Sequence, residues 1–255
     1  MLELPRTPSF RLDGRRALVA GASSGIGLAG AVALAEAGAS VTLAARHAES
    51  LEAVAAALRA RGLPADTLTI DVADVAATTA AVAAHGPYDI LLNSAGTARH
   101  SRADEARLDD FDRVMALNVR GAFFLTQAVA KGLIAAGRPG SLINVSSQMG
   151  IVGGMERSVY CATKHAVEGF TKAMAIDWGA FGIRVNTLCP TFVRTPLSAV
   201  TLDDPDKAAW LLSKIKLGRV AEVTDMMGPV VYLASDASAL VTGTALLVDG
   251  GWTAE

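Results

Sequence analysis

Cysteine is scarce in this sequence: only 2 of the 255 residues are cysteines, Cys161 and Cys189, and they lack CxxC spacing. The 4 histidines form neither an HExxH nor an HxxxH pattern. We therefore expect neither a disulfide framework nor a metal site. Aromatic residues make up only 5% of the chain, whereas hydrophobic residues make up 51%, which is typical of a globular core built from small aliphatic side chains.

The sequence also lacks an excess of either positive or negative charge. The chain has 23 Lys plus Arg against 25 Asp plus Glu, a net charge of −2, with no long block of either sign. This balance argues against nucleic acid or an anionic membrane as the main partner. No uninterrupted apolar run approaches the ~18 residues of a membrane span, and the first residues carry no apolar signal region. We therefore expect a soluble, cytoplasmic protein that acts on a small molecule.

Short β-type runs alternate with Ala-rich segments of helical period from Arg16 onward, which predicts βαβ units and a parallel sheet. With no linker or repeat in the pattern, we expect one domain over residues 1–255. The predicted strands are 17–20, 40–44, 65–70, 88–92, 141–145, 183–188 and 245–248. The predicted helices are 25–37, 48–61, 74–84, 109–136, 159–181 and 222–235.

One stretch departs from this alternation. Residues 190–217 contain Pro190, Pro196 and Pro205 and one short helix-like piece at 206–214. The alternatives are a plain surface loop and a mobile substrate lid. We favour the lid, because the segment follows the carboxyl end of a strand, where binding sites of parallel sheets lie.

A glycine pattern follows the first predicted strand and opens a helix. Glycines in a G-x-x-x-G-x-G pattern let backbone N–H groups approach a pyrophosphate at the positive end of the helix, and the last glycine permits close packing on the strand. A glycine turn alone is a weak signal, but its strand and helix context favours a dinucleotide site over a plain tight turn. The expected binding residues are Gly21, Ser23, Ser24, Gly25, Ile26 and Gly27.

The second predicted strand leads into Arg46, where a cofactor with a free ribose hydroxyl would usually meet an acidic residue. Arg46 can instead pair with a 2′-phosphate, assisted by Ser23, Ser24 or His47, so we expect NADP, with NAD as the alternative. The competing interpretation is that Arg46 stacks on adenine or is simply solvated.

Tyr160 and Lys164 stand at i and i+4 of a predicted helix, so their side chains project from one face. Ser147 precedes Tyr160 by thirteen residues and lies just past a predicted strand, at the edge where carboxyl-end loops build sites. This spacing predicts that the three side chains share a site.

Together with Asn93-Ser94-Ala95-Gly96 and Asn118, these motifs make the sequence similar to the classical short-chain dehydrogenase/reductase family over about residues 12–252. The resemblance implies a Rossmann-type doubly wound α/β fold, with a seven-stranded parallel sheet flanked by helices in a single domain. It also places the family's catalytic tetrad on Asn118, Ser147, Tyr160 and Lys164.

The roles that the resemblance implies follow from hydride transfer between a carbinol carbon and a nicotinamide. A phenol with a pKa near ~10 needs help to exchange a proton at neutral pH, so we expect Lys164 and the cationic nicotinamide to lower the pKa of Tyr160. Ser147 would bind the substrate oxygen, and Asn118 would position a water that passes the proton from Lys164 to solvent.

Further cofactor contacts are implied by the same resemblance. Asp71 matches the acid that accepts from adenine, although a helix cap is its alternative role, and a turn is the alternative for Asn93. The segment from Pro190 matches the one that clamps the carboxamide. The full expected set adds Asp71, Val72, Asn93, Ala95, Gly96, Tyr160, Lys164, Pro190, Val193 and Thr195.

The residues that flank the tetrad are the candidate substrate contacts, and several are polar or charged. A polar site suits a sugar acid, polyol or hydroxy acid better than a steroid. The alternative is that the charged ones are rim residues. The candidates are Arg99, His100, Gln148, Met155, Arg157 and Phe192, with Thr97, Met149, Glu156, Thr191 and Leu197 beside them.

Three functions are compatible with these residues. The first is an NADP-dependent alcohol dehydrogenase or ketone reductase for a small polar substrate. The second is a 3-oxoacyl-thioester (acyl carrier protein) reductase, and the third is a non-catalytic NADP-sensing binding protein, which the intact tetrad disfavours. The resemblance also implies a homotetramer formed through the helices near 109–136 and 159–181 and the C-terminal strand.

Overall fold

Seven parallel strands form one sheet in the order β3-β2-β1-β4-β5-β6-β7 in the computed structural model, which describes residues 3–254. The domain predicted over 1–255 thus includes residues 1, 2 and 255, which lie outside the described residues. All seven predicted strands are confirmed, with ends that agree within two residues. They are β1 (Arg16–Ala20), β2 (Ser40–Ala45), β3 (Ala65–Thr69), β4 (Ile90–Asn93), β5 (Gly140–Val145), β6 (Ile183–Pro190) and β7 (Ala245–Val248).

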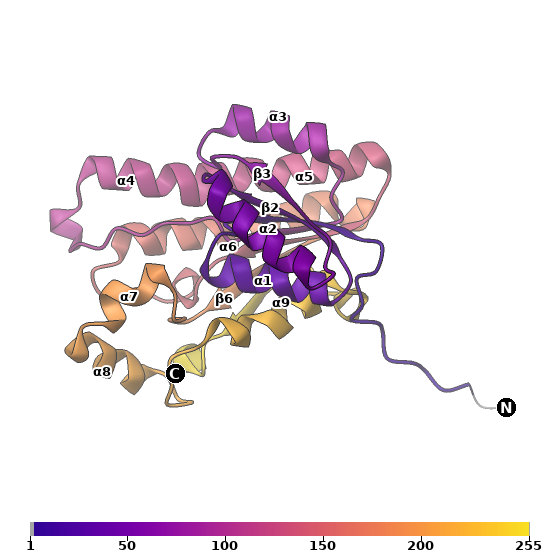
Figure 1. Cartoon of the computed structure of the whole chain (residues 1–255). Coiled ribbons are helices and arrows are strands. Elements are labelled where there is room, and N and C mark those ends of the chain that lie inside the picture. The colour runs from indigo at the N-terminus through magenta and orange to yellow at the C-terminus, as the bar shows by residue number, and fades with distance from the viewer. Residues whose placement is uncertain (1–2, 255) are drawn as a thin grey trace.

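Helices cover both faces of this sheet, as expected for the doubly wound fold (Figure 1). One core packs under α1 (Gly25–Glu36), α2 (Ala48–Ala60) and α9 (Met227–Ala234). The other packs under α3 (Val75–His85), α5 (Ala122–Ala136) and α6 (Ser158–Trp178). Because both faces are covered, the inner strands are buried almost throughout, which explains their continuous apolar runs.

The strand order positions the site. The chain winds from β1 to β3 in one direction and then crosses to β4, which lies on the other side of β1. β1 pairs in register with both neighbours, Val19 lying beside Leu43 of β2 and beside Leu92 of β4. A crevice therefore opens at the carboxyl ends of β1 and β4, where such sheets bind their ligands.

The predicted helix 109–136 is not one regular helix, and this corrects the sequence-based expectation. α4 (Leu108–Met115) runs through a π-helical segment, η2 (Ala116–Gly121), into α5. A side chain at Gly121 would meet the carbonyl oxygen of Val72 at 2.5 Å, so the wider turn accompanies a close approach to the loop after β3. By length and composition the whole stretch 108–136 could cross a membrane, but its contacts with α3, α6 and the sheet are those of a core helix.

Two other predicted helices change character at one end. The helix predicted over 159–181 ends as α6 at Trp178 and continues as the 3₁₀ segment η4 (Gly179–Phe181). The helix predicted over 222–235 begins as the 3₁₀ segment η5 (Val223–Met226) before α9. The remaining short segments are η1 (Ala103–Glu105), η3 (Gln148–Gly150), η6 (Asp236–Ser238) and η7 (Trp252–Ala254).

The segment 190–217 contains two helices, α7 (Pro196–Leu202) and α8 (Pro205–Lys214), where the sequence predicted only the second. Figure 1 shows both beside the carboxyl edge of the sheet, near the C-terminus and away from the N-terminal tail. Trp252 packs on this segment, with ring centroids 5.9 Å from Phe192 and 5.7 Å from Trp210. Trp252, near the C-terminus, therefore packs against both the start of this segment and α8.

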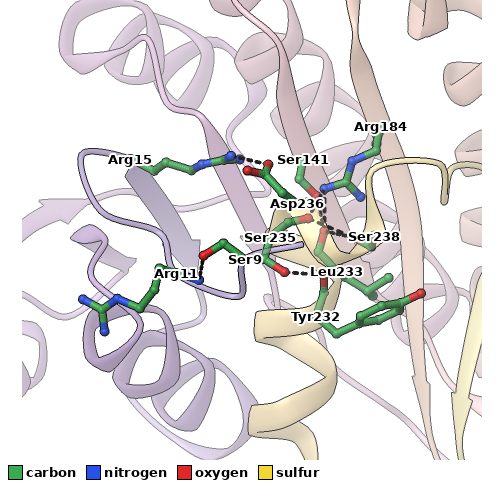
Figure 2. A network of polar contacts seen from close by, with 10 residues as sticks. All are labelled: Ser9, Arg11, Arg15, Ser141, Arg184, Tyr232, Leu233, Ser235, Asp236 and Ser238. Atoms are coloured by element: carbon green, nitrogen blue, oxygen red, sulfur yellow. Dashed lines mark hydrogen bonds and ion pairs between the residues drawn. The ribbon is translucent and has the colours of Figure 1, made fainter. Parts of the chain in front are cut away.

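A network of hydrogen bonds lies at the amino ends of β5 and β6, where it meets the carboxyl end of α9 (Figure 2). The carbonyl oxygen of Leu233 accepts hydrogen bonds from Ser141 (2.7 Å), Arg184 (2.9 Å) and Ser238 (3.0 Å). Arg184 also donates to the carbonyl oxygen of Ser235 at 3.2 Å. The last carbonyls of a helix have no partner within the helix, so these donors satisfy them and anchor α9 to β5 and β6.

Candidate active site

A cleft of about 360 Å³ runs along the carboxyl ends of the central strands. It extends from the glycine loop between β1 and α1 to the first turn of α6, and the segment 190–217 forms one wall. Most predicted site residues line it, namely Gly21, Ser23, Ser24, Gly25, Ile26, Arg46, Asp71, Val72, Ala95, Gly96, Ser147, Tyr160, Lys164, Pro190, Val193 and Thr195.

The glycine loop is as tight as the pattern predicts. Gly21 has φ +75°, and a side chain there would lie 2.8 Å from the carbonyl of Ser94. A side chain at Gly27 would overlap the carbonyl oxygen of Gly21, which leaves no space for any other residue. Gly25 has φ +55° and faces Thr195, so segment 190–217 reaches the loop. The loop leaves its backbone open toward the cleft, as a dinucleotide pyrophosphate requires.

One end of the cleft carries the groups expected to surround an adenosine. Arg46 and His47 line it directly after β2, together with Ser23 and Ser24, and no acidic residue stands at that point. Asp71 lines the same end, and its carboxylate accepts a hydrogen bond from the N–H of Ala73 at 3.0 Å. The donors and the positive charge at this end fit a cofactor with a 2′-phosphate.

Asn93 and Gly27 are site candidates that support the cleft without lining it. The buried Asn93 amide donates to Asn144 Oδ1 at 3.1 Å, which ties β4 to β5 beneath the cofactor end. Gly27 lies behind the loop and only allows its close approach to β1. Both positions therefore shape the site indirectly.

Ser147, Tyr160 and Lys164 meet at the other end of the cleft. Ser147 follows β5, its Oγ accepts from the N–H of Met149 (3.1 Å), and it donates to Gln148 Oε1 (2.9 Å). The Lys164 ammonium donates to the carbonyl oxygen of Val145 at 2.8 Å and lies 5.5 Å from the centroid of the Tyr160 ring. One strand end and one helix face thus present a hydroxyl, a phenol and an ammonium to the same space.

Burial dominates the electrostatics of this group. It raises the pKa of Tyr160 to about 12, although hydrogen bonding with Ser147 and the charge of Arg157 act in the opposite direction. Burial also lowers the pKa of Lys164 to about 8, against the opposing effects of Cys189 and Glu168. Lys164 is not among the groups that lower the pKa of Tyr160, and burial of the phenol itself outweighs those that do, so the chain's own residues do not give the expected lowering. A cationic nicotinamide would supply further positive charge when bound.

Asn118 lies in the π-helical segment η2 and is held on both sides of its amide. Its Nδ2 donates to the carbonyl oxygen of Thr97 (2.8 Å) and to Thr163 Oγ1 (3.2 Å), while its Oδ1 accepts from the N–H of Thr97 (2.9 Å). The side chain therefore joins the loop after β4 to α6 at Thr163, the residue before Lys164, although Asn118 itself does not line the cleft. π-Helical turns of this kind are frequent at functional sites.

The substrate candidates divide into two groups. His100, Gln148, Arg157 and Phe192 line the cleft, as do Thr97, Met149, Thr191 and Leu197. Arg99 and Met155, also predicted as substrate contacts, do not line the cleft. Arg99 points outward and pairs with Asp110 at 3.6 Å. Met155 is 68% exposed, and it precedes Glu156, whose positive φ of 59° turns the chain just before α6.

Thr201 is a cleft residue that sequence reasoning missed. It lies on α7, is buried, and its hydroxyl accepts a hydrogen bond from Arg157 at 3.2 Å. The missed signal is local: Thr195 followed by Pro196 is a helix start of the N-cap and first-position proline type. Recognising α7 would have brought Thr201 to the wall of the cleft.

Comparisons with known proteins agree with this geometry. A family model described as enoyl-(acyl carrier protein) reductase matches residues 21–253. Relatives include the D-erythrulose reductase of Gallus gallus, 42% identical over 96% of this chain and 98% of its own length. The gluconate 5-dehydrogenase of Gluconobacter oxydans is also 42% identical, with 96% of each chain covered.

A solved structure extends the similarity to three dimensions. The gluconate 5-dehydrogenase from Burkholderia cenocepacia, in complex with NADP and tartrate, aligns with a TM-score of 0.93 and 40% identity over 96% of this chain and 98% of that chain. The family model, the relatives and the fold lead to one conclusion: this chain is a member of the classical short-chain dehydrogenase/reductase family, an oxidoreductase acting on CH–OH groups.

Proposed function

We propose that this protein is an NADP-dependent oxidoreductase that transfers a hydride between the nicotinamide and a secondary alcohol or ketone of a small polar substrate. The observation that carries the proposal is the meeting of Ser147, Tyr160 and Lys164 in one cleft with the glycine loop. The named relatives support the substrate class, since D-erythrulose is a small sugar and gluconate a sugar acid.

The cofactor assignment rests on the adenosine end of the cleft. Arg46, Ser23 and Ser24 offer a positive charge and hydroxyl donors to a 2′-phosphate, and no carboxylate stands after β2 to select a free ribose hydroxyl. The related Burkholderia cenocepacia enzyme was crystallised with NADP. We assign NADP as the favoured cofactor and NAD as the weaker one.

In this proposal the chain's own residues handle the proton and the substrate oxygen. Tyr160 gives its phenolic proton to the oxygen during ketone reduction and takes it back during alcohol oxidation. Ser147 hydrogen-bonds the same oxygen, and its geometry is fixed by Met149 and Gln148. Lys164 supplies positive charge beside Tyr160 and binds the nicotinamide ribose, while Asn118 positions the water that passes the proton to solvent. The bound cofactor supplies the hydride acceptor or donor.

Segment 190–217 acts as the substrate lid in this proposal. Its residues Phe192 and Thr195 line the cleft, and Thr195 contacts the glycine loop at Gly25. A cover that spans the cofactor end and the substrate end excludes water from the reacting groups when it closes.

We further propose a homotetramer located in the cytoplasm. Apolar side chains remain exposed on α5, on α6 and just after it: Phe124 is 37% exposed, Ile176 is 82% exposed and Phe181 is 51% exposed. An uncovered apolar face of this kind suits a contact between copies of the chain. Light scattering after size exclusion tests the tetramer, and an Ile176→Glu variant is expected to reduce its mass. Fractionation of producing cells tests the compartment.

The direct test of function follows absorbance of reduced nicotinamide across sugar acids, polyols, ketoses and acetoacetyl thioesters, with NADP and NAD in parallel. We expect turnover of the sugar-derived compounds with NADP. Turnover of the thioesters alone would instead establish the 3-oxoacyl-thioester reductase. Cofactor binding without any turnover would point to the non-catalytic NADP-binding protein.

A further inference from the structure

Arg157 is a cleft residue that the hydride-transfer machinery does not use. It directly precedes α6, three residues before Tyr160, and lines the same end of the cleft as Ser147. Its guanidinium carbon lies 5.6 Å from the centroid of the Phe192 ring, and its Nη2 donates to Thr201 Oγ1 at 3.2 Å. The lid thus holds the guanidinium in place from one side.

Among the carboxylates of the described residues, only that of the adjacent, exposed Glu156 acts on the charge of Arg157. No carboxylate of the described residues forms an ion pair with it, and Asp71, at the opposite end, is the one acidic residue among those that line the cleft. Burial is the main influence on Arg157 and lowers its pKa, outweighing the opposing charges of Tyr160, Cys161 and Glu156. A partly desolvated cation that no carboxylate contacts is unfavourable, and an anionic ligand would remove that cost.

The other polar side chains at this end of the cleft, Gln148, Thr191 and His100, add hydrogen-bonding groups and no negative charge. Gln148 is buried and its Oε1 accepts from Ser147, while its Nε2 has no partner among the described residues. The buried hydroxyl of Thr191 is also without a partner there. Partial burial and the charges of Arg157 and Lys207 lower the pKa of His100 to about 4, which leaves this imidazole neutral at pH 7.

The guanidinium keeps most of its binding capacity. It has five N–H donors, of which the contact with Thr201 uses one, in the part of the chain that the structure describes. Its planar fork matches a carboxylate through two parallel hydrogen bonds. Residues three positions apart at a helix start are close neighbours, so an anion on Arg157 and a carbinol at Tyr160 belong to one small molecule.

We propose that Arg157 binds the carboxylate of the substrate, so that this enzyme prefers sugar acids and hydroxy acids to neutral sugars and polyols. The inference rests on the proposed function and narrows it to one half of the substrate class. Gln148 and Thr191 then bind hydroxyl oxygens of the same substrate.

The experiment compares matched substrates that differ only in the carboxylate: gluconate against glucitol for oxidation, and 5-ketogluconate against L-sorbose for reduction, each with NADP(H). We expect the wild-type kcat/KM to favour both acids. In Arg157→Gln, the acids are expected to lose about ten- to hundredfold in kcat/KM through a higher KM, whereas the neutral compounds change by less than about threefold. Arg157→Lys should recover part of the loss.

Thr201→Val is the matched control, because it removes the contact between the lid and Arg157 but keeps the charge. We expect the ratio of acid to neutral kcat/KM to stay at the wild-type value in this variant. Equal losses for acids and neutral compounds in Arg157→Gln, or a collapse of the ratio in Thr201→Val, would reduce Arg157 to a support of the lid and overturn the inference. A wild-type preference for glucitol 6-phosphate over gluconate would overturn the claim that Arg157 binds a carboxylate.

The two proposals fail in different ways. Turnover of neutral compounds without preference for the acids keeps the proposed function and overturns the role of Arg157. If no pair is turned over, the proposed function fails, and calorimetry of gluconate binding with NADP⁺ present decides the inference alone. Binding that is lost in Arg157→Gln supports the carboxylate site, and binding that is absent or unchanged in the variant overturns it.

Discussion

Replacing Lys164 by methionine is predicted to change how the stability of this protein depends on pH. The ammonium is buried, and burial lowers its pKa from 10.5 to about 8. The unfolded chain therefore binds this proton more tightly than the folded chain. The cost to the folded state is present in full below about pH 8 and vanishes as the pH rises toward 10.5. At about 1.4 kcal/mol for each pH unit, it amounts to about 3 kcal/mol.

The assay is urea unfolding of the wild type and Lys164→Met between pH 7 and pH 10. For the wild type we expect the free energy of unfolding to rise by about 2 kcal/mol relative to the variant over this range. Tyr160, whose pKa is raised from 10.0 to about 12, acts in the opposite sense as the pH reaches 10, but it is present in both proteins, so its contribution cancels in the comparison. The exposed Lys172 on the same helix offers the control: Lys172→Met should keep the wild-type slope.

The decisive quantity is the slope of the free energy of unfolding against pH. The urea midpoint at a single pH combines the cost of burying the ammonium with the loss of its hydrogen bond. Lys164→Met also removes the hydrogen bond to the carbonyl oxygen of Val145, which costs about 1–3 kcal/mol at every pH. Parallel pH profiles for the wild type and Lys164→Met would refute the reasoning, since they would mean that the buried ammonium carries no penalty. Loss of activity in the same variant is expected from its position beside Tyr160.

Three further predictions concern other parts of the chain. Arg46→Ala should raise the KM for NADP about tenfold and leave the KM for NAD unchanged, since one charge-assisted hydrogen bond is lost. Arg61→Ala, which removes an exposed charge directly after the carboxyl end of α2, is the control. An unchanged KM for NADP in Arg46→Ala would contradict the phosphate contact. Tyr160→Phe should lower kcat by about 10²–10⁴-fold in both directions while cofactor binding, measured by fluorescence, persists; a fully active variant would remove Tyr160 from proton transfer. Arg184→Met should destabilise the fold by about 2 kcal/mol in urea unfolding, because the carbonyl of Leu233 loses a charged donor, with kcat unchanged; an unaltered unfolding midpoint would contradict the anchoring of α9.

Much of the architecture could be predicted because it repeats locally. The alternation of apolar runs and Ala-rich segments located all seven strands, and the glycine pattern after β1 marked the loop whose close packing the structure shows at Gly21 and Gly27. The i, i+4 spacing of Tyr160 and Lys164 was enough to put both side chains in one cleft. These features depend on neighbours within a few residues, which a sequence displays directly.

Features that depend on distant segments were not predictable in the same way. The π-helical turn at Asn118 accompanies the approach of Gly121 to the loop after β3, and nothing in the apolar period of residues 108–136 announces it. Arg99 and Met155 are substrate candidates by their position in the sequence, but Arg99 pairs with Asp110, Met155 is exposed, and neither lines the cleft.

The sequence by itself determined the order of the strands along the chain, the family and the glycine loop after β1, and it predicted the residues of the tetrad. Only the tertiary structure decided how deeply Tyr160 and Lys164 are buried, and hence the direction of both pKa changes. It also decided that Arg157 lies between Phe192 and Thr201 with no ion-pair partner among residues 3–254. The physical reason is that local patterns are set by hydrogen bonds and side-chain periods a few residues long. Desolvation and charge balance are sums over every segment that surrounds a group in space.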